Sequence, residues 1–121
     1  MRSFLLFAFL SIFSLASPVL SAREAREQAR IDFLLHQVET SVGLKFIRNG
    51  AEHDGVAAAA HLRGKLGAAA ARVATAEDFI KYCGSESSMT HQRYKVKTAD
   101  GTLLDAAAYF QGELRKFDEK R

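Results

Sequence analysis

The amino-acid sequence predicts a mainly helical α+β domain with about four helices and a small two-stranded sheet. Two observations carry this prediction. Apolar residues recur at spacings of three and four in residues 23–42 and 105–117, which is the period of an amphipathic helix. In residues 93–98, apolar and basic residues alternate instead, as in a strand with one solvent-facing side. The expected order is therefore helix, strand, helix, helix, strand, helix.

The first helix is expected over residues 23–40, and Gly43 is a suitable C-terminal stop. Residues 44–47 are typical of a short strand, and Asn49-Gly50 is a strong turn signal because both residue types tolerate positive φ. The apolar stripe of the helix would consist of Ile31, Leu34, Leu35, Val38 and Val42.

The second helix is expected to begin after Asp54, whose side chain can cap the free N–H groups, and to end at Gly67. A third, shorter helix would follow Thr75. Its first residues nearly match a capping box, with Asp78 in place of the usual Glu or Gln, and Gly84 would end it. The apolar side chains facing the core would be Ala58, Ala59, Leu62, Leu66, Phe79, Ile80 and Cys83.

The last third of the chain is expected to hold a polar loop at 85–92, the second strand at 93–98 and a turn at Asp100-Gly101. Asp105 would then cap the final helix. Two short strands are not stable alone, so we expect them to pair with each other and to lie against the helices.

The first 22 residues have the order of a secretory signal peptide: Arg2, then an apolar stretch, then small residues after the helix breaker Pro18. We expect cleavage after Ala22, with Ser21 as the alternative. An uncleaved anchor is the weaker interpretation, because Pro18 and the serines interrupt the apolar stretch before it reaches bilayer length. The expected location is periplasmic or secreted, without a stable membrane anchor after cleavage.

Residues 23–121 would then form a single small globular domain. Only one of the 17 Lys and Arg residues and none of the 14 acids lies before it, so its formal charge is +2, too small to imply a nucleic acid partner. Cys83 is the only cysteine, which excludes an intramolecular disulfide. We interpret it as a half-buried small hydrophobe, with a reactive or dimer-forming thiol as the alternative. The oligomeric state stays open.

Several short segments of the chain form a recognisable set. They are Phe46-Ile47-Arg48-Asn49-Gly50, Glu52-His53, His61-Leu62-Arg63, Lys65-Leu66, Thr75-Ala76-Glu77, Phe79-Ile80, Ser87-Ser88 and Tyr94-Lys95-Val96. Together they resemble the YfeK-like family of small exported bacterial proteins, a family of unknown function. The resemblance spans residues 31–117 and implies an envelope location, but no reaction, cofactor or catalytic residue. Residues 90–93 depart from the usual family pattern.

Catalytic and metal chemistry have little support in the residue pattern. No two histidines have the i, i+4 spacing that would place them on one helical face, so we assign no metal and no cofactor. A cluster of Glu52, His53, Asp54 and His61 is conceivable only if the turn folds onto the second helix. The serines at 85–88 lie near His91 in sequence, but no nucleophile elbow surrounds them. We therefore assign no catalytic residue.

Positive charge is the more informative pattern. Residues 55–76 contain Arg63, Lys65 and Arg72 before the first acid, Glu77. If the two strands pair, basic side chains from the turn, the second helix and the second strand could form one surface for an anionic group. Solvated charge that protects a short strand edge is the competing interpretation. The candidate binding residues are Arg48, His61, Arg63, Lys65, Arg93 and Lys95.

The sequence thus favours a non-catalytic periplasmic accessory or binding protein that engages an anionic ligand or an acidic protein. The alternative is a small hydrolase that uses the serines of residues 85–88 with a histidine. A third interpretation is a structural subunit that docks on a larger assembly.

Overall fold

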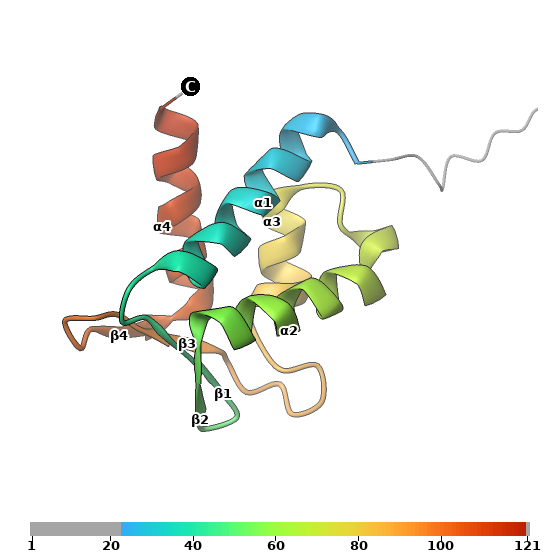
Figure 1. Ribbon diagram of the computed structural model, residues 1–121. Coiled ribbons are helices and arrows are strands. Elements are labelled where there is room, and N and C mark those ends of the chain that lie inside the picture. Colours follow the sequence, from blue (N-terminus) through green and yellow to red (C-terminus); the bar gives the residue numbers. More distant parts are fainter. Residues whose placement is uncertain (1–22, 121) are drawn as a thin grey trace, which may run out of the picture.

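The computed structural model describes residues 23–120; the predicted signal peptide, residues 1–22, lies outside the described residues. Figure 1 shows the helices gathered on one side of a small sheet, with α4 and α2 on either side of α1. The elements are α1 (Ala25–Thr40), β1 (Lys45–Arg48), β2 (Ala51–Asp54), α2 (Gly55–Ala68), the 3-10 turn η2 (Ala70–Arg72), α3 (Ala76–Phe79), the π-helical turn η3 (Ile80–Gly84), β3 (Lys95–Lys97), β4 (Leu103–Asp105) and α4 (Ala106–Glu119).

Within residues 23–120, the predicted class, α+β and mainly helical with about four helices, is confirmed, but the prediction of a two-stranded sheet was wrong. The sheet has four antiparallel strands in the order β2-β1-β3-β4. The two predicted strands do pair with each other and form its centre as β1 and β3. The sequence pattern missed both edge strands, β2 and β4.

The edge strands lack an apolar alternation because neither of them has a buried residue. β2 exists because the turn at Asn49 and Gly50, with φ of 51° and 81°, folds the chain back onto β1. β4 follows the turn at Gly101, whose φ is 89°. Turn geometry and backbone pairing therefore build these strands, rather than the burial of side chains.

Two of the three predicted helix caps are confirmed. The Asp54 carboxylate accepts a hydrogen bond from the Ala57 amide at 2.8 Å, at the first turn of α2. Thr75 and Asp78 form a reciprocal capping box at the start of α3. Asp satisfies this arrangement although it is shorter than Glu or Gln, since its carboxylate accepts from the Thr75 amide at 3.2 Å.

The third cap, one residue of the predicted apolar stripe and the end of α2 differ from the prediction, whereas the end of α1 at Thr40 agrees with it. Asp105 occupies the N-cap position of α4, but its side chain makes no capping bond and pairs with Lys95 instead. α1 ends at Thr40, so Val42 falls outside the apolar stripe and is 90% exposed. α2 continues through Gly67 to Ala68.

The core lies between the helices and one face of the sheet. α1 packs against α2 and α4, and α4 also packs against β3. Cys83 belongs to this core and is fully rather than half buried; burial raises the pKa of its thiol. The largest fully buried side chains are Tyr94, Phe46, Phe79, Phe110, Ile31, Leu34 and Leu62.

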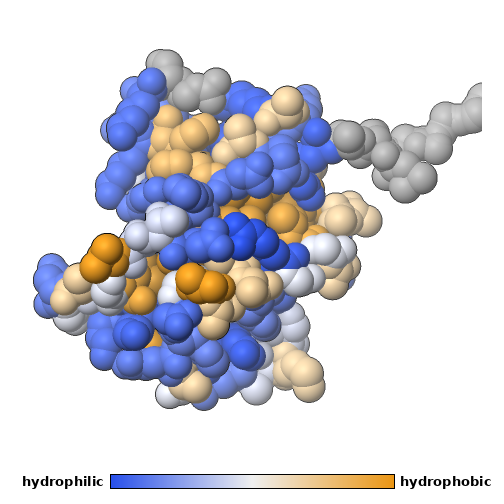
Figure 2. Space-filling view, viewed as in Figure 1, coloured by the Kyte–Doolittle hydropathy of each residue, from blue (hydrophilic) through white to orange (hydrophobic). Residues whose placement is uncertain are grey.

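The outside of the molecule is largely hydrophilic. On the face drawn in Figure 2, strongly apolar residues are exposed at separate places rather than in one continuous patch. Among the residues that the structure describes, no helix is both long and apolar enough to cross a bilayer. The large hydrophobic residues with high exposure are Val42, Val56, Met89 and Leu103.

Candidate functional site

The two faces of the sheet differ in character. The candidate binding residues of the sheet are divided between these faces. Phe46 pairs with Val96, and both side chains are buried against the helices. Ile47 pairs with Lys95, so these two lie on the opposite face. Arg48 follows Phe46 by two positions and therefore lies on the helix-facing side, whereas Lys95 does not. The sheet thus does not bring all the predicted basic residues onto one surface.

Three basic residues on the outer face, Arg93, Lys95 and Lys97, have acidic partners. Lys95 Nζ lies 2.6 Å from one carboxylate oxygen of Asp105, and an Arg93 guanidinium nitrogen lies 3.4 Å from the other. Lys97 contacts Glu52 at 2.7 Å. These pairs lower the pKa of both carboxyl groups. The alternating basic strand is therefore largely neutralised by its two edge strands.

Arg63 is also paired. It projects from α2 toward α1, where two of its guanidinium nitrogens donate to the carboxylate of Glu39 at 3.2 and 3.0 Å. Both side chains are partly exposed, and the hydrogen bonds from Arg63 lower the pKa of Glu39. This residue ties two helices together on the surface and lies apart from the remaining candidates.

His61 and Lys65 meet at a buried tyrosine. Tyr94 is 1% exposed, and its hydroxyl accepts a hydrogen bond from Lys65 Nζ at 3.1 Å. His61 Nε2 lies 3.4 Å from the same oxygen, so the Tyr94 hydroxyl can donate its own proton to a neutral imidazole. Lys65 also donates to the backbone carbonyl of Glu86 at 3.0 Å and lies 4.9 Å from the centre of the Tyr94 ring.

Further positive groups surround His61. Burial lowers the pKa of this imidazole, and the charges of Arg48, Lys65 and His53 lower it further. No carboxylate is among the groups that shift it. We call the set Arg48, His53, His61, Lys65 and Tyr94 the Tyr94 cluster. It combines residues from β1, β2, α2 and the segment before β3.

The lowered pKa of His61 predicts a pH dependence of stability. The unfolded chain takes up a proton near pH 6.5 while the folded protein resists it, so the free energy of unfolding should fall as the pH decreases from about 7 to 5. His61→Asn should flatten this part of the curve. Denaturant titrations of both proteins across this range test the expectation; parallel curves for the two proteins would contradict it.

Sequence reasoning identified Arg48, His61 and Lys65 but missed His53 and Tyr94 as members of the same cluster. The i, i+4 spacing of His61 and Lys65 places them on one face of α2, which was visible. Tyr94 was predicted only as an inward-facing strand residue. Its polar contacts depend on how α2 crosses the sheet, and the sequence pattern carries no signal for that.

The serine segment is bound to the local backbone. Ser85 Oγ donates to the Ile80 carbonyl at 2.6 Å, and Ser87 Oγ accepts from the Met89 and Thr90 amides at 3.2 and 3.3 Å. The His91 amide donates to the Ser87 carbonyl at 2.9 Å, but within residues 23–120 no hydrogen bond joins a serine side chain of this segment to an imidazole ring. His91 Nδ1 instead lies 2.8 Å from the Glu86 carboxylate.

The candidate metal cluster is also dispersed. Glu52 pairs with Lys97 on the outer face, and Asp54 caps α2. Across the described part of the chain, no group of three His, Cys, Asp or Glu side chains is placed to hold a metal ion.

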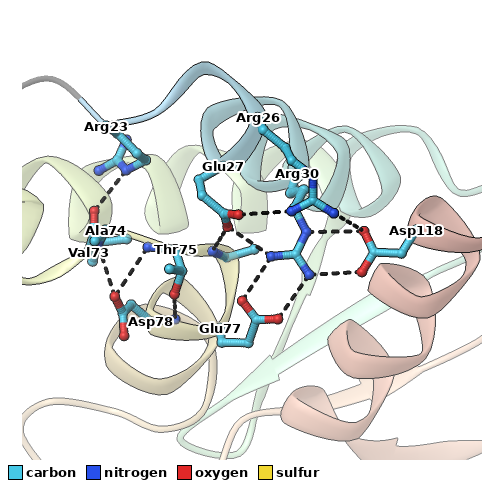
Figure 3. Close-up of polar contacts among 11 residues, drawn as sticks. Arg23, Arg26, Glu27, Arg30, Val73, Ala74, Thr75, Glu77, Asp78 and Asp118 are labelled. Atoms are coloured by element: carbon cyan, nitrogen blue, oxygen red, sulfur yellow. Dashed lines mark hydrogen bonds and ion pairs between the residues drawn. The ribbon is translucent and has the colours of Figure 1, made fainter. Parts of the chain in front are cut away.

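A second charged cluster, drawn in Figure 3, joins three helices. Arg30 of α1 has a side chain that is only 6% exposed, yet all five of its N–H groups reach carboxylates. Glu77 and Asp118 each bind it through both oxygens at 2.9–3.1 Å. Glu27 binds it at 2.8 Å and also accepts from the Ala76 amide, at the start of α3.

Arg30 and the three carboxylates around it form ion pairs with one another. Arg30, Glu77 and Asp118 line one end of a cavity of about 410 Å³ between α1, η3 and α4. Because every Arg30 donor already has an acceptor, this guanidinium offers nothing to a ligand. We call Arg30, Glu27, Glu77 and Asp118 the Arg30 cluster. We infer that its ion pairs hold α1, α3 and α4 together.

Comparison with known proteins agrees with the resemblance seen in the sequence. Residues 25–118 match a family of unknown function, DUF5329. The chain is also 40% identical, over 80 residues, to an uncharacterized protein called YfeK from Salmonella typhimurium (strain LT2); the match covers 66% of this chain and 67% of the relative. No solved structure matches. The chain therefore belongs to the YfeK-like DUF5329 family, whose function is unknown.

Proposed function

We propose that this protein is a non-catalytic accessory or binding protein of the periplasm that engages an anionic ligand or an acidic protein through the Tyr94 cluster. The observation that carries the proposal is an imbalance of charge. The cations outside the cluster that were candidates, Arg63, Arg93 and Lys95, all have carboxylate partners. Within residues 23–120, the cations of the cluster have no carboxylate partner.

The donors of the cluster support binding of an anion. Lys65 has three N–H donors, of which Tyr94 and the Glu86 carbonyl use two. Arg48 is half buried, and its side chain makes no hydrogen bond or ion pair with another residue of the described range. An anion near these groups would be attracted more strongly than in open water, because the buried side of the cluster screens charge less.

The expected location rests on the signal-like pattern of the first 22 residues and on the family resemblance. A periplasmic protein meets anionic polymers and acidic protein surfaces at the envelope, which is consistent with a site that recognises charge. The hydrolase alternative has no comparable support, since the contacts of Ser85 and Ser87 are with the backbone.

Binding to a polyanion should depend on Arg48 and not on Arg63. We expect Arg48→Gln to weaken binding of polyglutamate or polyphosphate by about five- to ten-fold at low salt, the loss of one charge-assisted contact. Arg63→Gln removes the same charge from a residue already paired with Glu39 and should leave binding within about two-fold. Fluorescence anisotropy at low and physiological salt measures both.

His61 provides an internal reporter. An anion bound beside it favours the protonated imidazole, so its pKa, lowered in the free protein, should rise in the complex. NMR titration of His61 with and without polyglutamate follows the change. Equal weakening by Arg48→Gln and Arg63→Gln, with no movement of the pKa of His61, would show non-specific attraction and refute the proposed site.

A further inference from the structure

Beside the Tyr94 cluster lies a hollow of about 270 Å³ between α2, η2 and η3. Lys65 belongs to both, because it also lines the hollow. Three alanine side chains form part of the wall and leave the space open. No carboxylate lines this hollow. The polar side chains in its wall are Lys65, Arg72, Tyr82 and Ser88.

Several of these groups have donors to spare. The third N–H of Lys65 is not used by Tyr94 or Glu86. The Arg72 guanidinium lies over the Tyr82 ring, 5.4 Å from its centre, and makes no hydrogen bond or ion pair with another residue in the described range. Ser88 adds a hydroxyl from the following loop. Donors therefore come from three segments of the chain.

We propose that this hollow binds a phosphate monoester group, with the oxygens held by Lys65, Arg72 and Ser88. A monoester carries nearly two negative charges at neutral pH and three oxygens that accept strong hydrogen bonds. Such a group matches two cations and a hydroxyl that approach from different sides. A carboxylate requires fewer hydrogen-bond donors, because one arginine can bind both of its oxygens from a single direction, as Arg63 does with Glu39.

The size of the hollow favours a small group. Pockets for whole drug-sized ligands occupy about 300 to 1,000 Å³, so about 270 Å³ suits a phosphate and the first atoms attached to it. The Tyr82 ring offers a surface for an apolar or aromatic portion of the ester. This inference rests on the proposed function, because Lys65 belongs to both sites.

Phenyl phosphate is the direct probe. We expect its Kd, measured by calorimetry, to rise about ten-fold in Arg72→Gln, the effect of losing a charge-assisted contact. Lys81→Gln is the matched control: it removes an equal charge that also lies over the Tyr82 ring, at 5.1 Å, but is outside the wall of the hollow. Its Kd should change by less than about two-fold.

Ala68→Leu tests the space itself. Leucine has nearly the helix propensity of alanine, so the fold should persist while the larger side chain fills the hollow and abolishes binding. Circular dichroism confirms folding of each variant. Equal Kd values for the wild type and Arg72→Gln, or for the wild type and Ala68→Leu, would overturn the proposal.

The source of the phosphate is decided by comparing phenyl phosphate with vesicles of phosphatidylcholine containing phosphatidic acid. Arg72-dependent binding to both, or to either, supports a phosphate monoester site and shows whether a soluble ester or a lipid headgroup fits it. Binding to vesicles that Arg72→Gln leaves unchanged overturns it. Arg48-dependent polyglutamate binding without phenyl phosphate or vesicle binding would refute this inference and leave the proposed function intact.

Discussion

Gly55→Ala should destabilise the protein by about 3 kcal/mol or more, one of the two largest effects we expect. Gly55 is the first residue of α2, where the chain passes the end of α1. A Cβ at this position would lie 2.1 Å from the carbonyl oxygen of Val38, a fully buried residue of α1. Neither group is the mobile end of a side chain, so the two helices would have to separate. Urea denaturation measures the loss.

Gly64→Ala is the matched control for this prediction. It makes the same substitution in the same helix, where a Cβ would meet nothing within 4 Å. Alanine is favoured over glycine in a helix interior, so we expect this variant to be more stable than the wild type by about 1 kcal/mol. If Gly55→Ala behaved like Gly64→Ala, the close contact between α1 and α2 would be disproved.

Arg30→Met should cost about 3 to 5 kcal/mol at neutral pH, because it removes the cation that Glu27, Glu77 and Asp118 share and leaves only the half-exposed Arg26 beside Glu27 and Asp118. Glu27 is the most affected of them, since its side chain is only 11% exposed. Arg63→Met is the control, because Arg63 and Glu39 are 48% and 33% exposed and a surface pair of this kind contributes about 0 to 1 kcal/mol. Thermal and urea unfolding compare the two variants.

The effect of Arg30→Met should also depend on pH. In the wild type, hydrogen bonds from Arg30 lower the pKa of Glu77 below its ordinary 4.5, so the stability from this pair is present above that pH and is lost as the pH falls through the lowered pKa. In the variant, the clustered carboxylates gain from protonation instead. The difference between the two proteins should therefore shrink in acid; a constant difference would argue against a charge effect.

The helices could be predicted because the information for them is local. The apolar stripe of α1, the Asp54 cap and the capping box of Thr75 and Asp78 each involve residues within a few positions of one another. The edge strands could not, because β2 and β4 contain no fully buried residue and depend on pairing with β1 and β3. Leu104 of β4 packs against the core but is only partly buried. The residues of both strands therefore lack the alternating apolar pattern that is typical of a strand with one buried face.

The candidate site was predictable only in part for a related reason. The basic character of residues 48–65 is a property of the composition, and the i, i+4 relation of His61 and Lys65 follows from a helix. Carboxylate partners that are distant in the sequence decide which basic side chains are paired and which can bind an anion. Glu39 pairs with Arg63 across two helices, whereas Arg48 and Lys65 have no carboxylate partner among the residues that the structure describes.

The sequence by itself determined the helical α+β class, the family and the expectation of export, since these depend on local periodicity, local motifs and the character of the first 22 residues. The tertiary structure alone decided the four-stranded sheet, the Arg30 cluster and the division between paired and unpaired cations. Long-range contacts bring charges together whose positions in the chain differ by up to 88 residues, and no local pattern records such a pairing.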